Sequence, residues 1–177
     1  MKIAIISDIH DNLVNLEKCL EWCTENKIEK IICCGDITNS ETLSVLARYK
    51  CVFLVYGNME IYDEDELVAY PNIINGGRTA IFNIAGKNIG ACHEPFLIKE
   101  VFNIKFPLER GVAQYSETGC VNPDIIFYGH THKPWIEEKN GVKLVNPGTL
   151  GGVFSRATFA VYDTEKPEPE LKILDLL

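Results

Sequence analysis

The sequence predicts an α/β fold in which a parallel sheet is covered on both faces. Between residues 2 and 58, short apolar runs alternate with segments of helical periodicity. Strands buried on both faces read as continuous apolar runs, as these do, whereas half-buried strands alternate between apolar and polar residues. Each run ends abruptly at a glycine or a polar residue, which indicates a turn at the carboxyl end of each strand.

The elements of the first half follow from this alternation. In the first predicted helix, four apolar side chains share one face, and Asn12 precedes them as a candidate N-cap. Strand, helix and strand repeat without interruption, which is typical of parallel βαβ units. The predicted elements are a strand at 2–7, a helix at 12–26, a strand at 30–34, a helix at 41–49 and a strand at 51–56.

The second half has a different pattern. Two strand-like runs flank the turn sequence Ala85-Gly86-Lys87, which predicts an antiparallel hairpin. A helical or irregular stretch follows at 94–118, interrupted by Pro95 and Pro107. No repeat, low-complexity tract or linker divides the sequence, so we expect one domain over residues 1–177. The predicted strands are 79–84, 88–92, 124–128, 142–145, 158–162 and 171–174.

Composition restricts the class of protein. The 177 residues include 46% apolar and 24% charged residues, a balance typical of globular proteins. No apolar stretch reaches the roughly 20 residues of a membrane helix, and the first apolar run stops at Ser7-Asp8, too early for a signal peptide. We therefore expect a cytoplasmic protein without a membrane partner. The net charge of −8 weighs against stable nucleic-acid binding, which needs clustered Lys and Arg.

The seven cysteines are best explained as buried free thiols. Their number is odd, no Cys-x-x-Cys pair occurs, and several lie inside apolar runs such as 31–34. A disulfide framework or a thiolate metal site would need closer spacing. Free thiols persist in a reducing compartment, which agrees with a cytoplasmic location. The residues are Cys19, Cys23, Cys33, Cys34, Cys51, Cys92 and Cys120.

Candidate metal ligands gather at the ends of five predicted strands. In open α/β sheets, ligands bind at the carboxyl ends of strands, so these distant segments are expected to meet. A glycine precedes the ligand in three of them, which suits a backbone that turns sharply off a strand. Any one histidine would more often be an ordinary core or surface residue, but all four histidines occupy such positions. The segments are Asp8-Ile9-His10, Gly35-Asp36, Gly57-Asn58, Ala91-Cys92-His93 and Gly129-His130-Thr131-His132.

Two aspartates, one asparagine and four histidines are more ligands than one metal ion needs. Oxygen and imidazole ligands without cysteine favour divalent ions such as manganese, iron, cobalt or zinc. Two ions that share a carboxylate lie about 3.5–4 Å apart, lower the pKa of a bridging water and clamp the oxygens of a phosphoryl group. No P-loop, Rossmann fingerprint or Ser-His-Asp arrangement competes. The pattern therefore predicts a dinuclear hydrolase of phosphate esters.

The ordered series D-x-H, G-D, G-N, H and G-H-x-H resembles the motifs of the calcineurin-like metallophosphoesterases. The series spans residues 8 to 132, and the short chain and the later run Asn146-Pro147-Gly148-Thr149 are most similar to the small YfcE-type phosphodiesterases. The resemblance implies a four-layer α-β-β-α sandwich, with two packed mixed β-sheets flanked by helices. It also implies hydrolysis of small phosphodiesters by attack of a metal-bridging hydroxide on phosphorus.

The resemblance further implies the roles of single residues. Asp36 is expected to bridge the ions, and Asp36, Asn58 and His93 are the expected catalytic residues. Asn12 is a candidate for substrate contact, although helix capping explains it equally well. Manganese is the expected ion, with nickel, cobalt, iron or zinc as alternatives. The implied ligands are Asp8, His10, Asp36 and His132 for one ion, and Asp36, Asn58, His93 and His130 for the other.

Three positions depart from the family pattern. Met59 stands where many members have a histidine that protonates the leaving group, and methionine cannot transfer a proton. Glu60 replaces the usual aspartate, and its longer side chain is expected to shift the supporting hydrogen bonds. His93 is followed by Glu94-Pro95 instead of Gly-His, so we expect a different backbone there and an extra carboxylate close by.

Other functions remain open at this point. A protein-interaction scaffold on the same fold is favoured by Met59 and Glu94 and disfavoured by the complete ligand set. A nuclease would use the same chemistry but lacks a basic tract here, and a structural metal site would not need two ions. A homodimer through an exposed edge strand is a further alternative. Apolar residues that could form a partner surface, or one buried helix face, are Phe96, Leu97, Ile98, Val101, Phe102, Ile104 and Phe106.

Overall fold

Two β-sheets packed face to face form the centre of the protein, a computed structural model that describes residues 1–105, 108–109, 112–113 and 121–177. The six-stranded sheet has the order β13 (Glu170–Ile173), β12 (Thr158–Asp163), β1 (Lys2–Ile6), β2 (Ile31–Cys33), β3 (Val52–Leu54) and β4 (Ile73–Asn75). The seven-stranded sheet has the order β10 (Trp135–Lys139), β11 (Val142–Asn146), β9 (Ile125–Phe127), β6 (Lys87–Cys92), β5 (Thr79–Ile84), β7 (Leu108–Glu109) and β8 (Val112–Ala113).

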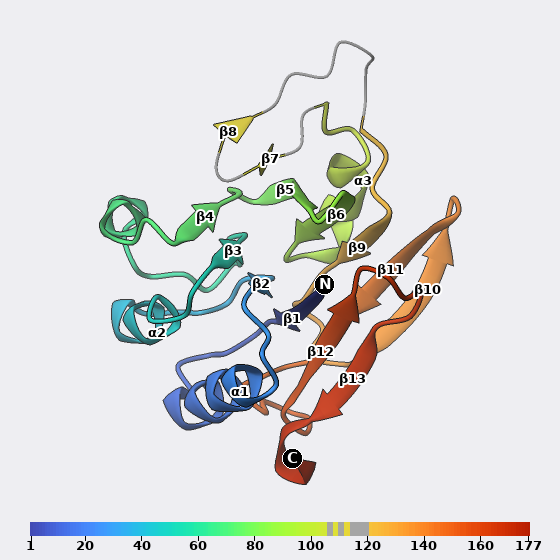
Figure 1. Cartoon of the computed structure of the whole chain (residues 1–177). Helices are drawn as coiled ribbons and strands as arrows, with labels where there is room; N and C mark the ends of the chain where they lie inside the picture. Colours follow the sequence, from blue (N-terminus) through green and yellow to red (C-terminus); the bar gives the residue numbers. More distant parts are fainter. Residues whose placement is uncertain (106–107, 110–111, 114–120) are drawn as a thin grey trace.

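Helices cover the outer faces of the two sheets. Figure 1 shows α1 (Leu13–Glu25) and α2 (Ser40–Leu46) on the outer side of the six-stranded sheet, and α3 (Ile98–Val101) on the outer side of the seven-stranded sheet. Short 3₁₀ helices are η1 (Glu64–Ala69), η2 (Pro95–Leu97) and η3 (Leu174–Leu176). These four layers confirm the predicted α-β-β-α sandwich.

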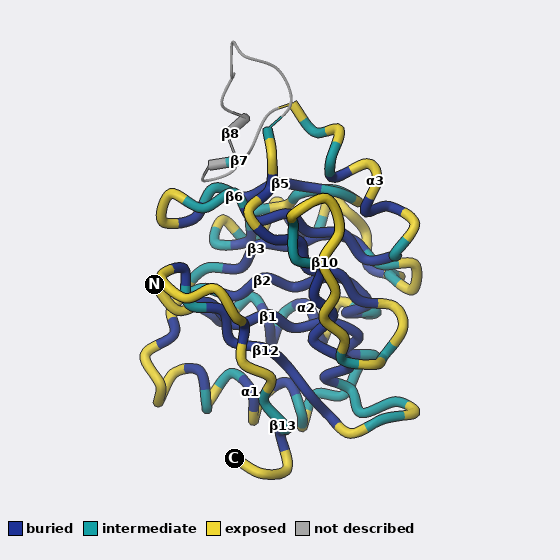
Figure 2. The backbone as a smooth tube through the Cα atoms, turned by 90° about the vertical axis from the view of Figure 1, so that its right-hand side faces the viewer, coloured by how far each residue is buried: buried dark blue, intermediate teal, exposed yellow. Residues whose placement is uncertain are grey.

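The three interfaces between layers account for the continuous apolar runs of the sequence. In β1, Ala4 and Ile6 pack toward the helices, whereas Ile3 and Ile5 pack toward the second sheet. Successive side chains of a strand point to opposite faces, so a strand in an inner layer needs apolar residues at every position. Figure 2 shows β2 and β3 as buried, and β1 as buried after its exposed first residue, in contrast to the exposed edge strand β10.

Most predicted elements are present at nearly the predicted positions. Strands β1, β2 and β3 pair in parallel, and β5 and β6 form the predicted antiparallel hairpin. Asn12 is the N-cap of α1, because its Oδ1 accepts a hydrogen bond from Asn15 N at 3.1 Å. The closing strands β11, β12 and β13 are confirmed within one residue at each end.

Four strands were not predicted: β4, β7, β8 and β10. Strands β7 and β8 have two residues each and lie in the stretch 94–118 that was expected to be helical or irregular. Strand β4 has only three residues, and it follows η1 in a segment without a long apolar run. Strand β10 is exposed at all five positions and pairs only with β11. An edge strand with no buried face has neither the continuous nor the alternating apolar pattern by which strands are recognised.

The apolar stretch after His93 is mainly a buried helix face. Leu97, Ile98 and Val101 are buried against β6 and β9, which favours the packing explanation over a partner surface. Phe96 remains exposed, and Phe106 and Cys120 lie outside the described residues.

The six cysteines in the described ranges are free, and five of them are buried. In the same ranges, no helix has the length and apolarity needed to cross a membrane.

Candidate metal centre

All seven candidate ligands lie close together where strands of the two sheets end. Asp8 follows β1, Asp36 follows β2 and Asn58 follows β3, all in the six-stranded sheet. His93 follows β6 and His130 follows β9, both in the seven-stranded sheet. The expectation that these distant segments would meet is therefore confirmed by the geometry. The members of the centre are Asp8, His10, Asp36, Asn58, His93, His130 and His132.

Five of the seven residues have a left-handed backbone. Non-glycine residues rarely adopt this region, which costs about 1–2 kcal/mol for each residue. Such conformations persist where the surrounding structure enforces them, and they gather at functional sites. The positive φ angles are 54° for Asp8, 46° for His10, 55° for Asp36, 69° for His130 and 59° for His132.

Two glycines allow the ligand loops to approach one another. A Cβ atom on Gly57 would lie 2.0 Å from Asp36 Oδ1. A Cβ atom on Gly129 would lie 1.9 Å from Ser7 Oγ and 2.7 Å from Asp8 Oδ2. Such distances are far below van der Waals contact, so the absence of a side chain is required at both positions.

One group of ligand atoms is formed by Asp8, His10 and His132. His132 Nε2 lies 3.2 Å from Asp8 Oδ1 and 3.1 Å from His10 Nε2. The other ring nitrogen of His132 donates to Val153 O at 3.2 Å, because a carbonyl oxygen can only accept. In the neutral ring, Nε2 therefore presents a lone pair toward the Asp8 carboxylate. The backbone N–H of His130 donates to the same carboxylate, at 3.2 Å from Oδ1 and 3.0 Å from Oδ2.

A second group surrounds His93. His93 Nδ1 donates to Cys34 O at 2.7 Å, which leaves Nε2 as the inward-facing atom. That atom lies 3.3 Å from Asp36 Oδ2, 4.0 Å from Asp8 Oδ1 and 3.1 Å from Asn58 Oδ1. Asn58 Oδ1 is also 2.9 Å from His130 Nδ1. Asp36 Oδ2 lies between the two groups, since it is 3.7 Å from His10 Nε2 as well.

The chemistry of these atoms fits divalent cations. Lone pairs of His93 and His132 face carboxylate oxygens, and such contacts are favourable only with a cation between the acceptors or a protonated ring. Backbone carbonyls hold the outer nitrogens of both rings, the usual arrangement that orients metal-bound histidines. Two candidate metal-binding groups are found among the described residues: Asp8 with His10 and His132, and Asp8 with Asp36 and His93.

The two buried aspartates differ in their protonation equilibria. Burial raises the pKa of Asp8 above its ordinary value, although His93 and the Ser7 hydroxyl oppose the shift. Burial acts in the same direction on Asp36, but the hydrogen bond and charge of His93 outweigh it and lower the pKa of Asp36. Burial would lower the pKa of His93, yet the two carboxylates raise it. Of the two carboxylates, Asp36 is thus the one whose pKa lies below its ordinary value.

Side chains next to the centre hold its loops in place. Glu60 accepts hydrogen bonds from Gly57 N at 3.1 Å, Thr38 N at 2.9 Å and Ile37 N at 3.3 Å. The longer side chain of Glu60 thereby joins the segment after β2 to the segment after β3. A carboxylate that accepts three backbone hydrogen bonds is held in one position, and it holds the two segments together.

The run at 146–149 has a similar supporting function. Asn146 Nδ2 donates to Gly129 O at 2.7 Å and to Thr131 Oγ1 at 3.1 Å. Thr149 Oγ1 donates to Asp8 O at 2.9 Å. The run therefore connects the histidine-bearing loop to the loop after β1.

Three predicted residues have additional partners that the sequence did not reveal. Asn12 caps α1 and also donates through Nδ2 to Gly151 O at 2.9 Å. The carboxylate of Glu94 is buried and pairs with Arg78 Nη2 at 2.6 Å, so it belongs to neither candidate metal group. The Met59 side chain is half exposed, and its backbone N–H donates to Asp36 Oδ1 at 3.0 Å.

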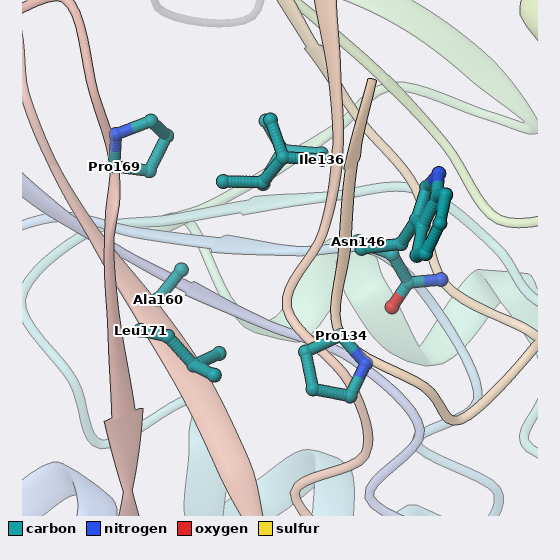
Figure 3. A pocket seen from close by; sticks show the side chains of 8 residues that line it. Pro134, Ile136, Asn146, Ala160, Pro169 and Leu171 are labelled. Carbon is teal, nitrogen blue, oxygen red and sulfur yellow. The ribbon is translucent and has the colours of Figure 1, made fainter.

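Two cavities differ in their relation to the centre. A cavity of about 390 Å³ adjoins it and is lined by Tyr56, Gly57, Asn58, Glu60, Tyr62, Glu64 and Arg78. A second cavity, of about 210 Å³, lies between β10, β11, β12 and β13 and is lined by apolar side chains such as Ile136 and Leu171 (Figure 3). Its lining contains no carboxylate, imidazole or thiol, and Asn146 is its one residue with a polar amide side chain.

Comparisons with known proteins agree with the fold and the motif series. Phosphodiesterase MJ0936 of Methanocaldococcus jannaschii is 29% identical over 95% of this chain and 96% of its own length. A solved archaeal phosphodiesterase shares the fold with a TM-score of 0.77 and 24% identity, covering 98% of this chain and 99% of that one. YfcE, a phosphoesterase from E. coli, has a TM-score of 0.62 and 19% identity, covering 93% of this chain and 89% of that one.

The family assignment rests on most of the chain. The description "Calcineurin-like phosphoesterase superfamily domain" matches residues 1–167, which include every candidate ligand and the supporting run at 146–149. The resemblance inferred from the ordered motifs is confirmed, and the fold is shared with YfcE. The chain belongs to the calcineurin-like phosphoesterase superfamily, which supports its assignment as a metal-dependent hydrolase of phosphoric esters.

Proposed function

We propose that the protein hydrolyses small phosphodiesters at a centre of two divalent cations, with manganese as the expected ion. The observation that carries the proposal is the convergence of seven ligand side chains in two groups that face one another. A relative named as a phosphodiesterase, similar over nearly the whole chain, supports the substrate class.

Free thiols support a reducing compartment, and we propose the cytoplasm as the location of the protein. We also propose that residues 1–177 form one catalytic domain.

In this proposal, the metal ions and the side chains of the centre have separate roles. Bound divalent ions supply a lowered pKa for water and polarisation of the phosphoryl oxygens. Asp36 is the proposed bridge, because its Oδ2 faces His10 at 3.7 Å and His93 at 3.3 Å. Asn58 also lines the adjoining cavity of about 390 Å³, so a substrate seated there would contact Asn58 directly. His93, fixed by Cys34 O, directs its Nε2 toward Asp36 and Asn58 in the second group.

Metal add-back tests this proposal. Protein stripped of metal is expected to have almost no activity on bis(p-nitrophenyl) phosphate, and manganese should restore at least about a hundredfold. Nickel, cobalt, zinc and magnesium are added one at a time as comparisons, and bound metal is measured by elemental analysis. We expect two ions per chain in the active form.

Failure of the add-back would have a definite meaning. If folded protein stays inactive with every ion, the phosphodiesterase proposal is wrong, and the scaffold alternative becomes the leading one. Full activity with a single ion per chain would contradict the dinuclear centre while leaving the hydrolase intact.

The residue after Asn58 leads to a prediction about the leaving group. Met59 offers no proton, so esters whose leaving oxygen needs little protonation should react best. We expect kcat/KM for bis(p-nitrophenyl) phosphate to exceed that for the alkyl monoester glycerol 2-phosphate by at least about tenfold. Met59→His should raise the alkyl rate, and Met59→Leu is the matched control. Equal rates of the unaltered protein on both substrates would refute this explanation.

A further inference from the structure

Phe154, beside the candidate centre, has an exposed side chain and a left-handed backbone conformation. Its side chain is 97% exposed, and its backbone has a φ of 59°. A single exposed apolar residue is ordinary on a protein surface. A bulky residue in the left-handed region is a true outlier, and here it is not compensated by packing of the side chain. Strained conformations of this kind are characteristic of functional sites.

The ring of Phe154 lies beside the imidazole of His132, a candidate metal ligand. Its centroid lies 6.1 Å from that of His132, and the two ring planes differ by 22°. The ring is thus roughly parallel to that imidazole while remaining open to solvent. Any flat group that lies on the exposed ring would be next to the group formed by Asp8, His10 and His132.

Hydrogen bonds to the ligand loops hold the segment that carries Phe154. Leu150 N donates to Ser7 O and Gly151 N donates to Asp8 O, each at 2.9 Å. Asn12 Nδ2 donates to Gly151 O, and His132 Nδ1 donates to Val153 O. The segment is therefore bonded to both sides of the centre up to the residue before Phe154, so its backbone, more than ring packing, positions the side chain.

We propose that Phe154 is a platform on which a flat aromatic group of the substrate stacks. The protein would then select phosphate esters whose alcohol carries an aryl ring or a similar flat ring system. The inference rests on the proposed function and adds the chemistry of the group attached to phosphorus. Stacking on an exposed aromatic face accepts any flat π-system, so it selects a chemical class rather than one molecule.

Two small ligands that differ only in the ring test this inference. Phenylphosphonate and methylphosphonate are titrated calorimetrically into manganese-loaded protein. The unaltered protein is expected to prefer phenylphosphonate by about three- to tenfold in Kd. Phe154→Ala should abolish the preference, whereas Phe154→Trp should retain it. Val68→Ala, which shortens an exposed apolar side chain in η1, is the matched control and should keep the preference.

A second variant separates the platform from a structural role. Phe154→Gly should relieve the backbone strain and raise the midpoint of thermal unfolding by roughly 2–4 °C, while still losing the aromatic preference. An unchanged preference in Phe154→Ala, with normal metal content, would overturn the inference alone. If the unaltered protein binds neither phosphonate and hydrolyses no diester with any ion, the proposed function itself fails.

Discussion

Asp36→Asn is expected to lower kcat/KM for bis(p-nitrophenyl) phosphate by roughly a thousandfold and to reduce the binding of both metal ions together. The carboxylate lies between the two ligand groups, and its pKa is held below the ordinary value by His93. An amide has similar size but lacks the negative charge that a shared ligand must supply. Activity and metal content per chain, measured on the same preparation, test the expectation.

Two other substitutions define what the Asp36 result means. His132→Ala removes a member of only one group, so we expect one ion to remain. Asp63→Asn makes the same chemical change at the N-cap of η1, where asparagine is an equally good cap, and should leave activity unchanged. Retention of two ions and nearly full activity in Asp36→Asn would contradict the bridging role.

Gly57→Ala is expected to damage both stability and activity. The added Cβ would lie 2.0 Å from Asp36 Oδ1 and 2.4 Å from Asp36 N, so the loops after β2 and β3 must separate. Overpacking of this kind costs about 3 kcal/mol, which lowers the midpoint of thermal unfolding by roughly 6–12 °C. The displaced carboxylate should also lower kcat/KM by about a hundredfold. Calorimetric unfolding and steady-state kinetics measure the two effects.

Gly86→Ala is the control for this substitution. Gly86 lies in the turn between β5 and β6 with a φ of 78°, and an added Cβ there would meet no described atom within 4 Å. It therefore reports the conformational cost alone, about 1 kcal/mol, without a steric clash at the centre. Equal losses of stability in the two variants, with activity kept in both, would show that close packing at Gly57 is unimportant.

The proximity of the ligands could be predicted from the sequence because parallel strands bring their carboxyl ends to one edge. Asp8, Asp36 and Asn58 follow β1, β2 and β3, which lie side by side and in parallel. The fully apolar runs identified these strands, since both faces of each are buried. The same rule was applied to His93 and His130, although the strands before them, β6 and β9, belong to the second sheet and the strand pattern alone did not separate the two sheets.

The features that escaped prediction depend on contacts without a local pattern. Val153 contributes only its backbone carbonyl to His132, and any residue type could do so. The strain at Phe154 is a property of φ, which a phenylalanine in the sequence does not indicate. Glu94 was expected as an extra carboxylate near the centre, but its pairing with Arg78 depends on the tertiary fold. Edge strand β10 has no buried face to mark it.

The separation of the ligands along the chain has a consequence for biosynthesis. His130 donates to Asp8 across 122 residues, and β1 acquires its neighbour β12 only from residues 158–163. A chain still emerging from the ribosome therefore holds Asp8, Asp36 and His93 before it holds His130 and His132. The full set of ligands therefore comes together only after the strands of both sheets have been synthesised and paired.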